Sequence, residues 1–321
     1  MPPEGRTLLD EVVHARKRLG GLVLRTPLIP LNGFEGPGKL YLKLECLQPT
    51  GSFKVRGAGN SILAALERGP VKGVYTTSAG NMAQALAWHA QRMGIPCTTI
   101  VPDSAPQAKL AGIRRFGAKI IQLPWDEVWE ITLNGVYQPL SESLYVPPFN
   151  HSDMIAGNGT IGAEIFEDLP EVESVFVPIG GGGLITGIAA ALRSVKPAAR
   201  VIACEPETAA PFTESLRTGR ASQFDRKPTF IDGSGASSVF PEMWDRMKGL
   251  VTESRVVSLE ETASAIRFLF ERQRVVAEGA AGTALAAALR ESSRPSIRVA
   301  VISGGNIDPA KLMTILSGSV P

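Results

Sequence analysis

Hydrophobic and polar residues follow a repeating pattern from about residue 71 to the C-terminal end of the chain. Short runs rich in β-branched residues, such as GVYTT at 73–77 and CTTIV at 97–101, each precede a longer segment in which small and apolar residues recur at helical spacing. Strands separated by crossover helices pair in parallel, and helices on both faces make the strands nearly continuously apolar, as in SVFVPI at 174–179. The pattern predicts an α/β protein with open, mostly parallel sheets covered by helices.

The same alternation gives the expected elements and their grouping into domains. We expect strands at 73–77, 97–101, 118–123, 174–179, 200–205 and 297–302, and helices at 81–94, 105–117, 124–135, 184–195, 209–217 and from 309 onward. Residues 69–150 contain their own series of strands and helices, between the segments PVKG and VPPFN. We therefore expect residues 69–150 to form a small mobile domain, and residues 1–68 and 151–321 to form a large domain.

Composition and charge narrow the function classes. Hydrophobic residues make up 44% of the 321 residues, which is enough for a sizeable core. The formal net charge of +2 gives no electrostatic case for binding nucleic acid or an anionic membrane. The polar N-terminal sequence is unlike a signal peptide, and no apolar run reaches the length of a membrane span. Three cysteines at long spacing are typical of reduced thiols, so we expect a cytoplasmic protein.

A run of four glycines, Gly180 to Gly183, lies between an apolar strand and a helix. Glycines allow the backbone to approach an anion, and a helix N-terminus offers unpaired N–H groups to it, so the run predicts a phosphate site. No lysine follows as in a P-loop, and the spacing fails the dinucleotide pattern GxGxxG in both frames. Glu205 stands where a ribose-binding acid would, so a nucleotide-dependent oxidoreductase remains a remote alternative.

Two further loops also follow strands. TTSAGNMAQ, residues 76–84, could hold a carboxylate or a phenolic oxygen, but taken alone its Ser and Asn favour an ordinary helix N-cap. ISGGNIDPAKL, residues 302–312, could be a tight turn in which Asp308 caps a helix that begins at Pro309. Three small-residue loops at strand ends indicate one shared pocket.

With these loops, nearly the whole chain resembles a known family, the fold-type II pyridoxal-phosphate enzymes, whose fold is like that of the tryptophan synthase β subunit. Within that family it looks like the threonine/serine dehydratases and serine racemases. The resemblance is carried by TPL at 26–28, KLECLQPTGSFKVRGA at 43–58, SAGN at 78–81, AGNGTIGAEI at 156–165, PIGGGGL at 178–184, CEPE at 204–207, AEGAAG at 277–282 and SGGNID at 303–308.

The resemblance implies a role for each matching residue. Lys54 would be the catalytic residue: it would form the Schiff base with pyridoxal 5′-phosphate and act as general base toward the Cα proton. Phe53 would pack against the cofactor ring, Asn81 would contact its phenolic oxygen, and Ser303 would hydrogen-bond its pyridine nitrogen. The cofactor phosphate would be bound by the backbone N–H groups of Gly180, Gly181, Gly182, Gly183 and Leu184. The substrate carboxylate would be bound by the loop and adjoining helix start formed by Ser78, Ala79, Gly80, Asn81 and Met82.

The implied activity is that of an ammonia-lyase (dehydratase) in amino-acid metabolism. Such an enzyme would convert a β-hydroxy amino acid of the L-threonine or L-serine type to a 2-oxo acid and ammonia. The absence of a regulatory domain after the last helix favours a catabolic or specialised dehydratase, and the resemblance implies a homodimer. A non-catalytic amino-acid-binding module remains another alternative, although it would not need Lys54.

Departures from the family pattern leave the substrate open. Ala79 replaces the serine that acts as the second base in serine racemases, which argues against racemisation but leaves it as an alternative. Met82 replaces the usual histidine, so the substrate could be bulkier, such as phenylserine or 3-hydroxyaspartate, or Met82 could simply pack under the loop. Pro211 stands where the relatives have a metal-binding aspartate near Glu205, so we expect no metal.

Two weaker expectations concern the surroundings of the site. Trp125 and Trp129 are spaced i, i+4, and we expect them to pack in the core of the small domain, with one indole over a cleft as the alternative. By resemblance, Asp232 would line the cleft.

Overall fold

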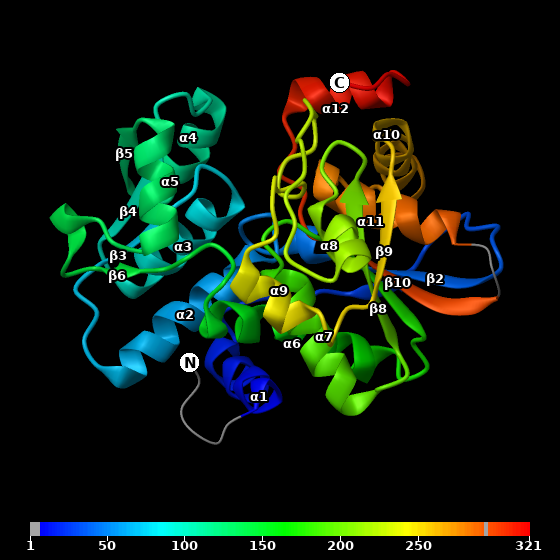
Figure 1. Cartoon of the computed structure of the whole chain (residues 1–321), viewed down its shortest axis with the longest axis horizontal. Coiled ribbons are helices and arrows are strands. Elements are labelled where there is room, and N and C mark those ends of the chain that lie inside the picture. Colours follow the sequence, from blue (N-terminus) through cyan, green and yellow to red (C-terminus); the bar gives the residue numbers. More distant parts are fainter. Residues whose placement is uncertain (1–6, 292–294) are drawn as a thin grey trace. The chain divides into compact units, whose positions relative to one another are not determined.

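The computed structural model describes residues 7–291 and 295–321, and their packing divides the chain into two units (Figure 1). Unit 1 contains the described residues up to Val23 together with Lys54–Asn158, and unit 2 contains Leu24–Phe53 and Gly159–Pro321. The α/β class and the mostly parallel sheets are confirmed, because both units are built around such a sheet.

The domain boundaries stay a prediction. The expected small domain, residues 69–150, lies within unit 1, which also includes the segments 7–23 and 54–68. Residues 1–6, which contribute to the expectation that the chain lacks a signal peptide, lie outside the described residues.

Unit 1 is a parallel sheet with helices on both faces. Its strand order is β5-β4-β3-β6, and each neighbouring pair is parallel. Its elements are α1 (Leu8–Leu19), α2 (Lys54–Arg68), β3 (Val74–Thr77), α3 (Asn81–Met93), β4 (Cys97–Pro102), α4 (Gln107–Arg114), β5 (Lys119–Leu123), α5 (Trp125–Asn134) and β6 (Leu144–Tyr145). The strands expected at 73–77, 97–101 and 118–123 thus appear as β3, β4 and β5.

Alternation along the strands of unit 1 builds a core on each face of the sheet. Val101 packs with residues of α3 and α4, whereas its neighbour Ile100 packs with Val128 and Ile131 of α5. Successive side chains of a strand point to opposite faces, so the two sets of helices cover opposite faces of this sheet.

The expectation that Trp125 and Trp129 are core residues is wrong. Their side chains are 58% and 36% exposed, and their rings stack on each other with centroids 5.9 Å apart. Val128 and Ile131 form the buried side of α5 instead. The i, i+4 spacing places two residues on the same face of a helix but does not say which face is covered.

Unit 2 is a larger sheet with the strand order β1-β2-β10-β7-β8-β9. β1 pairs antiparallel with β2, and the other neighbours are parallel. Its elements are β1 (Leu28–Pro30), β2 (Gly38–Lys43), β7 (Ser174–Pro178), α7 (Gly183–Val195), β8 (Arg200–Pro206), α8 (Pro211–Thr218), α9 (Pro241–Met247), β9 (Glu253–Val257), α10 (Leu259–Phe268), α11 (Gly279–Arg290), β10 (Ser296–Val301) and α12 (Pro309–Leu316). One further helix, α6 (Ser152–Asp168), is shared between the units.

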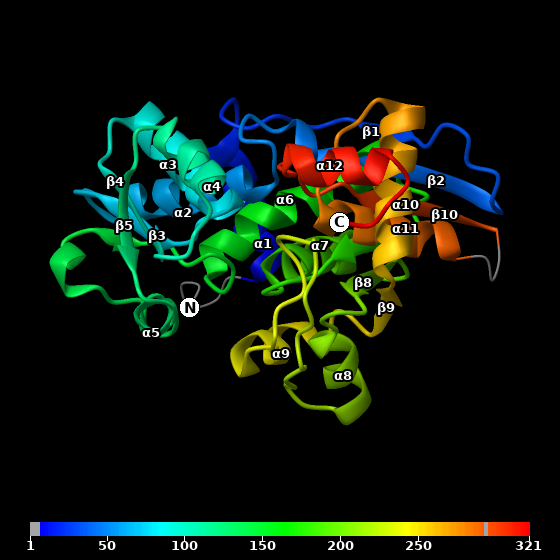
Figure 2. The same ribbon diagram turned by 90° about the horizontal axis from the view of Figure 1, so that it is seen from above.

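The central helix of unit 2 is α11, which packs on β7, β8, β9 and β10. Its run of small residues is almost completely buried, so this helix can lie close to the sheet. Helix α10 packs on α11, and α12 packs on α10; Figure 2 shows the three helices grouped together. The N-terminus of α12 is capped as expected, since Asp308 Oδ1 accepts the N–H of Ala310 at 2.7 Å.

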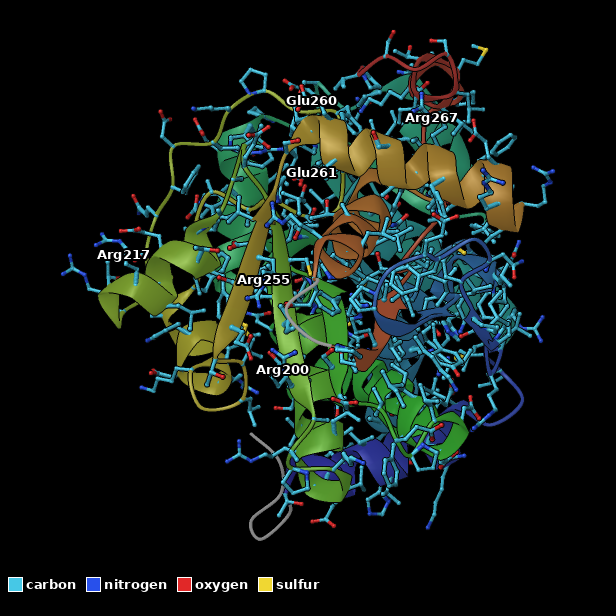
Figure 3. The ribbon with its side chains drawn as sticks, turned by 90° about the vertical axis from the view of Figure 1, so that its right-hand side faces the viewer. Arg200, Arg217, Arg255, Glu260, Glu261 and Arg267 are labelled. Carbon is cyan, nitrogen blue, oxygen red and sulfur yellow. The ribbon has the colours of Figure 1, made fainter. Side chains whose placement is uncertain are left out.

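One of the two edge strands of the unit 2 sheet, β9, carries charged residues. Arg200 on β8 forms an ion pair with Glu253 at 3.0 Å, and Arg255 forms one with Glu291 at 2.9 Å. Figure 3 labels Arg200 and Arg255 on this side of the sheet. Charges on an edge strand disfavour pairing with a strand of another chain.

No helix among the described residues is both long enough and apolar enough to cross a lipid bilayer.

Candidate active site

Lys54 is the first residue of α2 in unit 1. Its side chain is half-buried, and Nζ donates a hydrogen bond to the carbonyl oxygen of Pro148 at 2.6 Å. Pro148 lies three residues after the end of β6, so the chain beyond a strand end supplies the acceptor. The lysine is therefore held in a fixed place and partly withdrawn from water, unlike a solvated helix charge.

The loop of residues 78–81 joins β3 to α3 in unit 1. The interpretation of its serine or asparagine as an ordinary helix cap is wrong, because Gly80 is the N-cap residue and no side chain caps the helix. Ser78 Oγ instead accepts the N–H of Gly80 at 3.1 Å, within the loop. The first N–H groups of α3 have no acceptor within the helix, so this end can receive an anionic oxygen.

Met82 lies in the core of unit 1. Its side chain is 2% exposed and belongs to a cluster that includes Val55, Leu86 and Met154. Of the two interpretations of this residue, the structure favours packing under the loop.

The glycine run of unit 2 forms a backbone turn that leads into α7. Gly182 is the N-cap residue, with a φ of 88°, a conformation that other residues rarely adopt. A Cβ at Gly182 would lie 2.8 Å from Met247 Sδ, and one at Gly180 would lie 2.9 Å from the carbonyl oxygen of Gly233. Thr186 N–H, bonded to Gly182 O at 3.0 Å, makes the first intrahelical bond, so the earlier N–H groups of α7 are free of intrahelical acceptors.

Two expected site residues that are 250 positions apart meet within unit 2. The N–H of Phe53 donates to the carbonyl oxygen of Ser303 at 2.9 Å, and Asn306 Nδ2 donates to the carbonyl oxygen of Thr50 at 2.8 Å. Residues 50–53 are thereby tied to the loop that follows β10. Ser303 is 1% exposed, and its hydroxyl has no hydrogen-bond partner within the described part of the chain.

Glu278 is a residue of this region that the sequence did not single out. It is 4% exposed, and its N–H donates to the carbonyl oxygen of Gly304 at 3.0 Å. Its carboxylate leaves no room for a Cβ on Gly304, and a Cβ on Gly233 would lie 3.6 Å from it. The sequence feature that could have identified Glu278 is its position as the only acidic residue of AEGAAG, directly before a helix.

Comparisons with known proteins identify the family of the chain. The family model described as pyridoxal-phosphate dependent enzyme matches residues 20–304. The chain belongs to this family of pyridoxal-phosphate-dependent enzymes. Its expected family and its expected cofactor, pyridoxal phosphate, are therefore confirmed.

The relatives of this pyridoxal-phosphate-dependent enzyme include lyases and racemases. An L-threonine ammonia-lyase of Thermotoga maritima is 43% identical over 306 residues, which cover 94% of this chain and 76% of the relative. A catabolic L-threonine dehydratase of Escherichia coli is 35% identical over 319 residues, covering 96% and 95%. The solved structure of maize serine racemase is 31% identical, covers 96% of each chain and has a TM-score of 0.87.

The residues of unit 2 fit the cofactor. The buried hydroxyl of Ser303 lacks a partner within the described chain, and a pyridine nitrogen would supply one. The glycine run leads into the start of α7, whose first N–H groups have no acceptor within the helix and can donate to a phosphate.

Glu205, the residue that matches a metal ligand of relatives, is engaged otherwise. It is 1% exposed and accepts the N–H groups of Phe212 and Thr213 at 2.8 and 2.7 Å, so it caps the start of α8. Burial raises the pKa of Glu205, and these hydrogen bonds oppose that rise. Asp232, expected beside the cleft, pairs with Lys311 at 3.2 Å. The expectation of no metal stays a prediction.

The three cysteines have free thiols, as expected for reduced residues. Cys204 is completely buried, whereas Cys46 and Cys97 are half-buried. Burial raises the pKa of Cys46 and of Cys97 to about 12, so neither thiol is a reactive thiolate near neutral pH.

Proposed function

We propose that the protein is an ammonia-lyase that converts a β-hydroxy amino acid of the L-threonine or L-serine type to a 2-oxo acid and ammonia. The observation that carries this proposal is the agreement of the chain, over 94–96% of its length, with an L-threonine ammonia-lyase and an L-threonine dehydratase.

The proposed roles are as follows. The N–H groups of the glycine run and of Leu184 hold the cofactor phosphate, Ser303 Oγ holds the pyridine nitrogen, and Phe53 packs against the ring. When bound, pyridoxal phosphate supplies an aldehyde that condenses with amines and a ring that stabilises negative charge at Cα. Asn81 contacts the phenolic oxygen of the cofactor.

Lys54 would hold the cofactor through its Nζ and would act as general base toward the Cα proton. As an ammonium ion Lys54 donates to Pro148 O, at 2.6 Å. To take the Cα proton it must be a neutral amine. The N–H groups and side chains of residues 78–81 hold the carboxylate of the substrate, which fixes its Cα for the proton transfer. Loss of the β-hydroxyl and hydrolysis of the released product complete the conversion of L-threonine to 2-oxobutanoate and ammonia.

Three tests together decide this function. The purified protein is expected to be yellow, and borohydride reduction is expected to fix the cofactor on Lys54. Ammonia and 2-oxo acid are then measured with L-threonine, L-serine, D-serine, 3-hydroxyaspartate and phenylserine. Lys54→Ala is expected to lower kcat/KM at least about 10³-fold, whereas Lys72→Ala, at a lysine whose side chain is 68% exposed, leaves it unchanged. Release of ammonia from none of these amino acids refutes the proposal.

Serine racemase is the second candidate, supported by the similarity to the maize enzyme. Ala79 argues against it, because no hydroxyl stands at that position to return a proton from the opposite face of the substrate. Interconversion of L- and D-serine faster than ammonia release would favour this candidate. The bulkier-substrate alternative loses its support, since Met82 packs in the core.

The proposal includes a homodimer in the cytoplasm. The free thiols agree with a reducing compartment. Mass measurement in solution tests the dimer.

A further inference from the structure

Three hydroxyl groups meet at the C-terminal ends of β3 and β6 in unit 1. Thr77, the last residue of β3, lies with its Oγ1 2.9 Å from the phenolic oxygen of Tyr145, the last residue of β6. Thr132 of α5 lies with its Oγ1 2.8 Å from the same Thr77 oxygen. Thr77 is buried and the other two residues are half-buried, so water competes little for these bonds.

The protons of these hydroxyls allow more than one arrangement. Thr132 Oγ1 also lies 2.7 Å from the carbonyl oxygen of Val128, and one hydroxyl proton cannot serve both neighbours at once. Thr132 donates to Thr77 Oγ1 or to Val128 O, whereas between Thr77 and Tyr145 either oxygen could be the donor. The Thr77 hydroxyl thus either accepts from Tyr145 or donates to it, and it has a hydroxyl neighbour on each of two sides.

The backbone on both sides of this network leads to the candidate active site. Thr77 directly precedes Ser78, the first residue of the proposed carboxylate loop. Tyr145 is three residues before Pro148, whose carbonyl oxygen accepts the hydrogen bond of Lys54. The N–H of Val146 continues the strand pairing with the carbonyl oxygen of Tyr75 at 2.8 Å. One pair of hydroxyls, Thr77 and Tyr145, thus restrains both segments.

We infer that the hydroxyls of Tyr145, Thr77 and Thr132 are a positioning device for the loop of residues 78–81, which sets how firmly that loop holds the carboxylate of the amino acid. The inference rests on the proposed function for the identity of the ligand. The three residues act through the loop, and none of them is placed in contact with the substrate.

The test compares two tyrosines on neighbouring strands. Tyr145→Phe removes the hydroxyl that bonds Thr77. Tyr75→Phe is the matched control, because its ring lies 5.1 Å from that of Tyr145 but its hydroxyl bonds Gly135 O at 3.1 Å and the N–H of Tyr137 at 3.2 Å. In the cofactor-loaded protein, Tyr145→Phe is expected to speed hydrogen exchange of the amides of residues 78–81 by about two- to tenfold, the range that one net hydrogen bond gives. Tyr75→Phe is expected to leave that exchange unchanged.

Binding and turnover give the second readout. L-alanine lacks a β-hydroxyl and cannot eliminate, so its Kd, followed by the absorbance of the cofactor, reports binding of an amino acid, its carboxylate included, without turnover. This Kd and the KM for L-threonine are expected to rise by about two- to tenfold in Tyr145→Phe, with kcat changed less than about twofold, since the proton transfer groups are intact. Thr77→Val is expected to behave like Tyr145→Phe. Thr77→Ser, which keeps the hydroxyl, is expected to show the wild-type Kd for L-alanine and the wild-type KM for L-threonine.

Equal effects of Tyr145→Phe and Tyr75→Phe, or failure of Thr77→Ser to restore exchange and binding, would overturn the inference. Failure of the proposed function is distinguishable, because the wild-type protein would then turn over none of the amino acids while the exchange of residues 78–81 still reports the network.

Discussion

His89 is predicted to make the stability of the protein fall as the pH drops from 7.5 to 5. It lies on α3 with 1% of its surface exposed, and its Nε2 is 2.8 Å from the carbonyl oxygen of Val55. Since a carbonyl only accepts, the bond requires the tautomer with the proton on Nε2. Burial lowers the pKa of His89 from 6.5 to about 4, and nearby Arg92 contributes, while the bond to Val55 opposes the shift.

The sign and the size follow from these two pKa values. As the pH falls below 6.5 the unfolded chain takes up a proton at this histidine before the folded protein does, so unfolding becomes more favourable. At pH 5 most unfolded chains carry this proton and few folded molecules do, which lowers the free energy of unfolding by about 2 kcal/mol relative to pH 7.5. The contribution of the neutral, buried His89 to the free energy of unfolding is complete above pH 6.5 and is lost as the pH approaches 4.

Urea unfolding at pH 7.5 and at pH 5.0 measures the effect in the wild type and in His89→Gln, whose amide can donate to Val55 O. The loss of stability between the two pH values is expected to be about 2 kcal/mol smaller in the variant. His14→Gln, which replaces a half-buried histidine of α1, is the matched control variant. The chain has only three histidines, so an NMR titration can follow His89 directly. A measured pKa near 6.5, or equal losses in wild type and His89→Gln, would refute the reasoning.

Two further predictions concern unit 2. Lys43 is fully buried and pairs with Glu164 at 2.6 Å, so Lys43→Met leaves a buried carboxylate and is expected to lower the free energy of unfolding by about 3–5 kcal/mol. Adding Glu164→Gln is expected to recover much of this loss, and urea unfolding of the wild type, the single variant and the double variant checks it. Gly182→Ala would force a side chain into a φ of 88° and toward Met247 Sδ, so it is expected to weaken retention of pyridoxal phosphate, measured by dialysis and cofactor absorbance. Gly249→Ala, where a Cβ meets no atom within 4 Å, is the control, and equal retention in both variants would contradict the role of the turn.

The regular part of the fold was predictable because it depends on local patterns. The expected strands 174–179 and 200–205 appear as β7 and β8, since apolar runs bounded by turn residues determine such strands locally. The antiparallel pairing of β1 with β2 was not foreseen: β1 has three residues and no alternation of its own. Likewise, the outward direction of Trp125 depends on which face of α5 the sheet covers, and the helical period does not contain that information.

The candidate site was predictable as a set of motifs but not as a set of contacts. The sequence identified the residues expected to hold pyridoxal phosphate, and the family match supports the cofactor. It did not indicate that Pro148 O would accept the bond of Lys54, nor that Tyr145 would meet Thr77, because these contacts join segments 68 or more residues apart. Glu278 was overlooked for the same reason, since its role depends on its contact with Gly304.

The segment around Lys54, the proposed catalytic lysine, shows why the position of such a residue cannot be read from its neighbours in sequence. The residue before it, Phe53, donates its N–H to Ser303 O within unit 2. The residue after it, Val55, accepts a bond from His89 within unit 1, where the same imidazole leaves no room for a Cβ on Gly59. Both bonds act on the backbone, so they restrain Lys54 whatever its side chain does. A lysine that exchanges one bonding partner for another during a reaction needs a side chain that can move and a backbone that stays in place. Here that restraint comes from Ser303 and His89, which lie 249 and 35 residues away along the chain.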